Sequence, residues 1–280
     1  MASLNQLDTK RERLLDLLRS FDSCAVAFSA GVDSTVVAKA AQLALGDRAV
    51  AVTGVSASLA DGELDEARRL ADWIGIRHEI ISTEEFANSN YTQNAPDRCY
   101  HCKSELYTQV EQLAPRLGVR VIVNGANADD ASDYRPGNQA AAEHSVRSPL
   151  LECGINKAEV RQLAADWGLP IWDKPAMPCL ASRVAYGEEV TPGRLAMIDQ
   201  AERLLRDRGL RTVRVRYHKG DLARLEVPAD ELGPLVEPAT RQALVEGLKD
   251  LGFRFITLDL EGFRSGSLNT LVPLDILSAS

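Results

Sequence analysis

The sequence predicts an α/β protein in which a doubly wound parallel sheet is followed by a smaller C-terminal α+β domain. Short apolar runs of strand length alternate with helical patterns in the first half of the chain, which is the order of a parallel sheet covered by helices. The chain changes character between Leu169 and Gly193, where an apolar loop carries several prolines. We therefore expect one domain over residues 1–170 and a second over residues 171–280.

The expected first domain opens with leucines at helical spacing over Leu7–Leu18. Strands are predicted over residues 24–28, 48–54, 77–81 and 120–126, and helices from residue 33, over 61–73 and over 102–117. In a parallel sheet of this kind, ligands bind at the carboxyl ends of the strands. The loops that begin at Ser29, Thr53 and Asn124 should therefore share one cleft.

The expected second domain has the order helix, hairpin, helix, strand, with its segments over residues 192–208, 212–217, 222–227, 240–251 and 253–260. Arg214 and Arg216 leave the same face of the hairpin because they are two residues apart. Two guanidinium groups suit a phosphate or a carboxylate, and Arg183 could join them. The alternative is a solvated face balanced by acidic neighbours such as Glu226.

A turn of small residues, Ser29-Ala30-Gly31, separates the first strand from the helix that follows it. Such a turn presents backbone N–H groups and a positive helix end to phosphate oxygens. Ser29 and Ser34 add hydroxyl groups, and Asp33 adds a carboxylate suited to Mg²⁺. The turn lacks the Gly-Lys-Ser/Thr ending of a Walker A loop. An ordinary turn between a strand and a helix is the alternative.

The segment SAGVDS resembles the pyrophosphate loop, SGGxDS, of the ATP pyrophosphatase superfamily, whose members cut ATP between its α- and β-phosphates. Ala30 stands where many members have glycine. Its methyl group argues against a strongly positive φ at this position, and about 1 kcal/mol of strain would follow if one were required.

A second polar loop follows the last predicted strand of the first domain, in the segment NGANADD. Adjacent carboxylates in a loop are often only solvated. Because Asn127, Asp129 and Asp130 follow a strand that should end beside the phosphate turn, we expect them to hold Mg²⁺ or ribose hydroxyls.

Composition places the chain among soluble globular proteins, since 45% of its residues are hydrophobic and 26% are charged. The formal net charge of −8 argues against a large nucleic-acid surface. We find neither an apolar run of membrane-spanning length nor a signal-peptide core. A cytoplasmic protein with reduced cysteines is therefore expected.

The five cysteines are of two kinds. Cys24 and Cys153 fit buried, inert positions. Cys99 and Cys102 form a Cys-x-x-Cys pair at a helix start, which favours thiolates, and Cys179 is a possible third ligand. Three thiolates suit a 4Fe–4S cluster with one open iron. A zinc site with His101, a dithiol redox pair, and a nucleophilic Cys179 are the alternatives.

Taken together and in order, the motifs resemble the LarE family over nearly the whole chain. They are SAGVDST, CYHCK, GANADDASDYRPG, SPLLE, NKAEVRQLA, GLPIWDKPAMPCLASR, RVRYH, ARLEV and LDLEGFRSGSLN. LarE proteins are ATP-dependent sulfur-inserting enzymes in synthesis of the nickel-pincer nucleotide, the cofactor of lactate racemase. The resemblance implies an adenine nucleotide alpha hydrolase-like fold, with a C-terminal domain for substrate binding and oligomerisation. It also implies that a carboxylate of pyridinium-3,5-biscarboxylic acid mononucleotide is adenylated, with release of pyrophosphate, and then converted into a thiocarboxylate.

By the same resemblance, three groups of residues form the site. The ATP and Mg²⁺ group is Ser29, Gly31, Val32, Asp33, Ser34, Thr53, Lys103, Asn127, Asp129, Asp130 and Arg135, with Asp33 on Mg²⁺. The substrate group is Ser182, Arg183, Glu202, Arg214, Arg216 and Glu226. The sulfur-handling group is Cys99, Cys102 and Cys179.

The family divides over its source of sulfur. Members with one cysteine at the position of Cys179 sacrifice its sulfur and are left with dehydroalanine. Three-cysteine members, which this sequence resembles, hold a 4Fe–4S cluster whose open iron binds sulfide from a donor and passes it to the acyl-adenylate. Family resemblance also suggests a homo-oligomer, a hexamer, with no nucleic-acid or membrane partner.

Three other functions remain open at this point. A tRNA-thiolating enzyme of the superfamily would share the loop and the cluster, but the acidic charge argues against it. An amide-forming synthetase would need an ammonia source, and no glutaminase segment is visible. A nucleotide sensor without catalysis would leave Cys179 and the arginines without a role.

Overall fold

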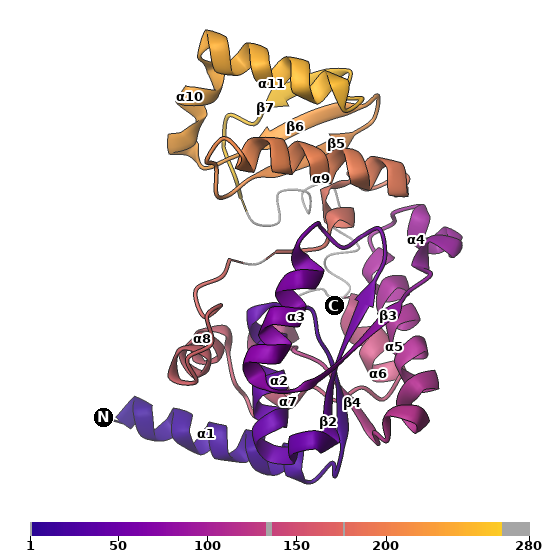
Figure 1. Ribbon diagram of the computed structural model, residues 1–280, viewed down its shortest axis with the longest axis vertical. Helices are drawn as coiled ribbons and strands as arrows, with labels where there is room; N and C mark the ends of the chain where they lie inside the picture. The colour runs from indigo at the N-terminus through magenta and orange to yellow at the C-terminus, as the bar shows by residue number, and fades with distance from the viewer. Residues whose placement is uncertain (1, 133–135, 176, 265–280) are drawn as a thin grey trace. The chain divides into compact units, whose positions relative to one another are not determined.

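The computed structural model describes residues 2–132, 136–175 and 177–264. The chain divides into two compact units, both drawn in Figure 1. The first is made from residues 1–56, 62–85 and 99–177, and the second from 57–61, 86–98 and 178–280. The second unit therefore includes two short segments from the first half of the chain. The domain boundary expected after residue 170 stays a prediction.

The first unit is built on a parallel sheet with the strand order β3-β2-β1-β4. Its strands are β1 (Cys24–Ala27), β2 (Ala49–Val55), β3 (Arg77–Ser82) and β4 (Val121–Val123). Every neighbouring pair is parallel, so the carboxyl ends of the strands lie at one edge. The doubly wound parallel sheet predicted from the alternating pattern is confirmed.

Side chains alternate along β1 between two hydrophobic clusters. Cys24 and Val26 belong to a cluster that contains residues of α1, α2, α3 and α8, whereas Ala25 and Ala27 belong to a cluster with α5 and α6. Figure 1 shows α2, α3 and α8 on one side of the sheet and α5 and α6 on the other. The helices of this unit are α1 (Ala2–Arg19), α2 (Val32–Leu45), α3 (Glu63–Ile74), α5 (Arg98–Leu117), α6 (Pro136–Glu143), α7 (Pro149–Glu152) and α8 (Lys157–Asp166).

The second unit contains a three-stranded sheet in the order β5-β6-β7. β5 (Arg214–His218) and β6 (Leu222–Glu226) form the predicted antiparallel hairpin, and β7 (Phe255–Leu258) pairs in parallel with β6. Its helices are α4 (Ser89–Thr92), α9 (Pro192–Arg206), α10 (Leu232–Val236) and α11 (Pro238–Asp250). The predicted order of helix, hairpin, helix and strand is confirmed.

Several predicted bounds were wrong. The last strand of the first sheet, expected over 120–126, is only Val121–Val123, because the N–H group of Asn124 pairs with the carbonyl of Arg147 (2.9 Å) and the chain then turns. The strand expected over 253–260 is Phe255–Leu258. Among the described residues, no helix is both long enough and apolar enough to cross a lipid bilayer.

Candidate functional site

The phosphate turn joins the end of β1 to the start of α2. Gly31 is the N-cap of α2, and no described side chain caps the first N–H groups of this helix. Those groups are the donors that a phosphate can accept from. The hydroxyls of Ser29 and Ser34 lie 3.2 Å apart, and Ser34 donates to the carbonyl of Gly31 (3.1 Å). The turn thus combines helix N–H groups with two hydroxyls.

Ala30 adopts the left-handed conformation at this turn. Its φ is +56°, so the expectation that its methyl group would exclude a positive φ was wrong. The chain has to pass from β1 into α2 within a few residues, and the bonds among Ser29, Gly31 and Ser34 hold it in this path. The cost for a residue with a side chain is about 1 kcal/mol.

Asp33, predicted to hold Mg²⁺, lies in the first turn of α2 between two partners. The ammonium group of Lys157 forms an ion pair with its Oδ2, and the Asn127 side chain donates to its Oδ1 at 3.2 Å. Asn127 was predicted at this site, and Lys157 was not. Lys157 is the first residue of α8 and is 124 positions away from Asp33 in the chain.

The loop after β4 is held by hydrogen bonds within the loop and by a hydrogen bond from the first residue of α8. The N–H of Asn127 donates to Asp130 Oδ2 (3.0 Å), and the N–H of Lys157 donates to Asp129 Oδ2 (2.9 Å). An ideal Cβ on Gly125 would lie 2.7 Å from the backbone nitrogen of Ser34, so the loop comes very close to the phosphate turn. The loops beginning at Ser29 and Asn124 therefore lie side by side as expected, and their sharing of one ligand cleft stays a prediction.

Thr53 does not begin a loop as predicted. It lies inside β2, which continues to Val55, and its buried hydroxyl donates to the carbonyl of Phe28 (2.8 Å). The same hydroxyl lies 2.8 Å from His78 Nε2, and burial lowers the pKa of His78. Lys103 lies within α5, and Arg135 lies outside the described residues.

In the second unit the predicted substrate residues form one group, which we call the arginine cluster. Arg183 is 1% exposed and binds Glu202 through Nε (2.9 Å) and Nη2 (3.2 Å). Its Nη1 donates to the carbonyls of Pro178 and Cys179. Arg183 therefore links Cys179 to α9. The members of the cluster are Ser182, Arg183, Glu202, Arg214, Arg216 and Glu226.

Arg214 and Arg216 start the β5 strand, and each is only 6% exposed, which rules out the solvated face considered above. Arg216 binds Glu226 (2.9 Å) and donates to the carbonyl of Ser182 (3.1 Å). Burial, followed by the charge of Arg183, lowers the pKa of Arg214 to about 10. The cluster buries more arginines than glutamates, and an excess of buried positive charge favours an anionic ligand.

The cysteines differ in exposure, and none of the five forms a disulfide. Cys24 is buried in β1, and burial raises its pKa to about 12; burial also raises the pKa of Cys153. Both are the inert residues that were predicted. Cys99 and Cys179 are exposed and Cys102 is half-buried.

Cys99 and Cys102 lie near the start of α5 in the first unit, whereas Cys179 belongs to the second. Among the described residues, no group of three or more His, Cys, Asp or Glu side chains is placed to hold a metal ion.

Comparison with known proteins decides the family. A family model described as asparagine synthase matches residues 14–129, which include the phosphate turn. An uncharacterised protein of Synechocystis sp. is 48% identical over 95% of this chain and 99% of its own. The pyridinium-3,5-bisthiocarboxylic acid mononucleotide synthase of Lactiplantibacillus plantarum is 38% identical over 94% of this chain and 95% of its own. The chain belongs to the LarE family.

LarE proteins are ATP-using sulfurtransferases, so this chain is an enzyme of that class. A tRNA-specific 2-thiouridylase of Beijerinckia indica is 31% identical to it, but over only 53% of this chain and 43% of its own. The similarity to the thiouridylase therefore covers about half of each chain, whereas the similarity to the L. plantarum synthase extends over nearly the full length of both chains.

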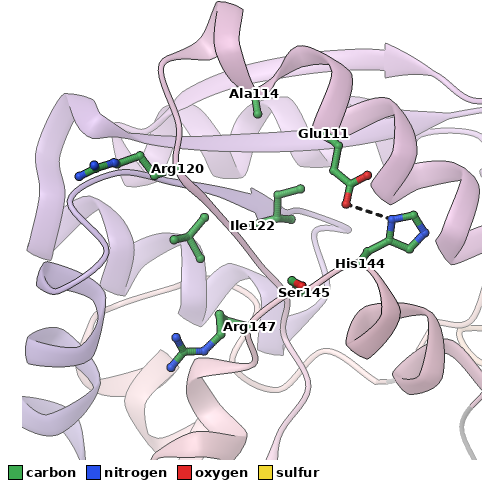
Figure 2. A pocket seen from close by; sticks show the side chains of 8 residues that line it. Glu111, Ala114, Arg120, Ile122, His144, Ser145 and Arg147 are labelled. Atoms are coloured by element: carbon green, nitrogen blue, oxygen red, sulfur yellow. Dashed lines mark hydrogen bonds and ion pairs between the residues drawn. The ribbon is translucent and has the colours of Figure 1, made fainter.

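This LarE-family chain has a further pocket, of about 360 Å³, at the start of β4. Figure 2 shows Arg120, His144 and Arg147 around it, with His144 bonded to Glu111 (3.0 Å). Arg120 and Arg147 also have carboxylate partners, Asp22 and Glu152. Because the phosphate turn lies at the opposite, carboxyl end of the strands, this pocket is separate from the candidate site.

Proposed function

We propose that this protein converts a carboxylate of pyridinium-3,5-biscarboxylic acid mononucleotide into a thiocarboxylate, using ATP. The observation that carries the proposal is the likeness to the L. plantarum synthase over almost the whole length of both chains. The bonded phosphate turn and the buried arginine cluster supply the two anion sites that this reaction needs, one for ATP and one for the mononucleotide phosphate.

ATP binds with its phosphates at the start of α2. The helix N–H groups and the hydroxyls of Ser29 and Ser34 donate to phosphate oxygens, beside Gly31 and Val32. Asp33 provides a carboxylate oxygen at the same place, a ligand that suits Mg²⁺. Mg²⁺ bound there would stabilise the charge that develops on the departing pyrophosphate. Further residues proposed around the nucleotide are Thr53, Lys103, Asn127, Asp129, Asp130 and Arg135.

The first chemical step is adenylation of the substrate. An oxygen of the pyridinium carboxylate attacks the α-phosphorus of ATP, a bond to that phosphorus forms, and the bond to the β-phosphate oxygen breaks. Pyrophosphate leaves and the carboxylate becomes an acyl-adenylate. The carbonyl carbon is now open to a sulfur nucleophile because AMP is a good leaving group.

The arginine cluster holds the phosphate of the mononucleotide, and within it Arg214 is the main ligand. Arg183 and Arg216 are each bound to a buried glutamate, Glu202 and Glu226. Burial, followed by the charge of Arg183, lowers the pKa of Arg214, and a phosphate beside these guanidinium groups would stabilise the charged form of Arg214. The Ser182 hydroxyl accepts from Arg183 Nη1 (3.2 Å) and donates to the carbonyl of Cys179 (2.7 Å).

Three thiols are available to handle sulfur. Cys99, Cys102 and Cys179 fit a 4Fe–4S cluster in the kind and number of their donor atoms, since none is in a disulfide. When bound, such a cluster supplies an iron with an open position for sulfide.

Sacrificial transfer from Cys179 is the second candidate, favoured by the exposure of that thiol. Its thiolate attacks the carbonyl carbon of the adenylate and AMP leaves. Loss of the Cα proton and cleavage of the Cβ–Sγ bond then give the thiocarboxylate and leave dehydroalanine. Arg183 serves both candidates because it holds the carbonyl groups of Pro178 and Cys179.

Exchange of labelled pyrophosphate into ATP tests the proposal. We expect exchange only when the pyridinium biscarboxylate mononucleotide is present, because adenylation of its carboxylate is reversible. An Asp33→Asn variant should lose the exchange, since Asp33 is proposed to hold Mg²⁺. A nucleotide sensor would bind ATP without any exchange, and a tRNA-thiolating enzyme would show exchange with tRNA and none with the mononucleotide.

A further inference from the structure

We propose that Lys157 is an ATP-binding residue that pairs with Asp33 before ATP arrives and with the β- and γ-phosphates afterwards. The inference rests on the proposed use of ATP at the phosphate turn. It concerns a residue on α8 that none of the sequence motifs for phosphate binding contains.

The ion pair between Lys157 and Asp33 places a cation where phosphate oxygens are expected. Lys157 Nζ is paired with Asp33 Oδ2 in the first turn of α2, the turn whose N–H groups have no side-chain cap among the described residues. The side chains are 35% and 24% exposed, so neither is sealed into the protein core. A ligand can therefore reach both groups.

The start of α8 is fixed by a dense set of bonds. Asn156 and Glu159 form a capping box, with each side chain bonded to the other residue's N–H at 2.9 Å. The N–H of Ala128 donates to the carbonyl of Ile155 (2.9 Å), and that of Lys157 donates to Asp129. The backbone of Lys157 is therefore held against the site by the loop that also carries Asn127.

The side chain can move while its backbone stays in place. Lysine has a flexible four-carbon stem and a point charge that needs no fixed direction of approach. With Asp33 as a ligand of Mg²⁺, its charge would no longer require an ammonium partner, and the phosphates of ATP would bring more negative charge than one Mg²⁺ neutralises. The ammonium group then pairs with the oxygens of the pyrophosphate portion, the group that leaves during adenylation.

The test compares two nucleotides, ATP and AMP, which differ in the pyrophosphate portion. Affinities of wild type and Lys157→Met for ATP and for AMP are measured by calorimetry with Mg²⁺ and without the pyridinium substrate. We expect the Kd for ATP to rise roughly ten- to a hundredfold, as for loss of a charge-assisted hydrogen bond, with the Kd for AMP unchanged. Lys157→Arg should keep part of the affinity for ATP.

Arg161→Met is the matched control, since it removes another cation from α8, one that donates to the carbonyls of Trp172 and Lys174. It should bind ATP like the wild type. An equal weakening of ATP and AMP by Lys157→Met, or unchanged ATP affinity with a lower Tm, would show that Lys157 is only structural. If the wild type binds no ATP, the proposed function itself fails.

Discussion

Arg183 is bound on two sides within the second unit. One edge of its guanidinium group is bound to Glu202, and another nitrogen holds the carbonyls of Pro178 and Cys179. Arginine is suited to this because its five donors lie in a fixed plane. The backbone at Cys179 therefore depends on a buried ion pair, and the position of the reactive thiol depends on it too.

Arg183 and Arg214 should differ in their effect on stability. Arg183→Gln should lower the free energy of unfolding by about 3–5 kcal/mol, because it removes the buried arginine partner of Glu202 and leaves the half-buried Arg206 at 3.5 Å. Arg214→Gln should lower it much less, since its contacts with the Val213 carbonyl and the Phe263 ring are lost but a buried charge is removed, and it should abolish binding of the mononucleotide. Urea unfolding of both variants checks this, and a large loss of stability in Arg214→Gln would contradict it.

The contribution of Arg214 to the free energy of unfolding follows from its lowered pKa. A folded-state pKa of about 10, below the usual 12.5, means that the unfolded chain holds the proton more tightly. The charged side chain therefore disfavours folding at all pH values below about 10, and the penalty decreases only as the pH rises through that value. A bound phosphate offsets it, so inorganic phosphate should raise the Tm of the wild type more than that of Arg214→Gln.

At the scale of elements, the phosphate site is made where the end of β4 meets the start of α2. Gly125 permits this contact, since any Cβ there would lie 2.7 Å from the nitrogen and 3.0 Å from the Cα of Ser34. These are backbone atoms at the beginning of a helix, and they cannot move aside as the tip of a side chain can. The close approach brings Asn127 to Asp33.

Gly125→Ala should therefore damage the phosphate site. Overpacking of this kind typically costs about 1–3 kcal/mol, and displacement of Ser34 should weaken ATP binding at least tenfold. Thermal unfolding and calorimetric ATP titration measure the two effects. Gly233→Ala serves as the control, because nothing lies within 4 Å of an added Cβ there. Equal Tm values and equal ATP affinities of the two variants would contradict the role of the contact between Gly125 and Ser34.

Elements that depend on local sequence could be predicted, and contacts between distant segments could not. The strands of the first sheet are short apolar runs, and the hairpin is marked by its Lys-Gly-Asp turn. Helix α8 was missed although Asn156 and Glu159 have the spacing of a capping box, which is a readable signal. The pairing of Lys157 with Asp33 had no such signal, because it arises only when α8 packs on α2.

The positions of some predicted site residues could be foreseen from the order of the elements, and their contacts could not. The loop containing Asn127 was placed beside the phosphate turn by the rule for parallel strands, as the structure has it. Thr53 was misplaced because the apolar run did not reveal that β2 continues to Val55. For Arg214 and Arg216, spacing predicted a shared face, but their burial depends on α9 and the segment after Cys179, which pack over that face.

At the scale of the whole molecule, the cluster proposal depends on three thiols that are not in disulfides, Cys99, Cys102 and Cys179. Anaerobically isolated protein should contain iron and sulfide, and a maleimide should label Cys99 and Cys179 only after a chelator has removed the iron. Cys24 should stay unlabelled throughout, because it is buried and its pKa is about 12. Iron-free protein after anaerobic reconstitution, or labelling that the chelator does not change, would contradict the cluster and favour sacrificial transfer.

The central claim is that ATP drives sulfur onto a carboxylate of the pyridinium mononucleotide. Mass spectrometry of the small molecules after anaerobic incubation with ATP, Mg²⁺, sulfide and the biscarboxylate mononucleotide tests it most directly. We predict a product in which one oxygen has been replaced by sulfur, formed together with AMP and pyrophosphate. ATP consumption with an unchanged mononucleotide, or an unchanged mixture, would contradict the claim.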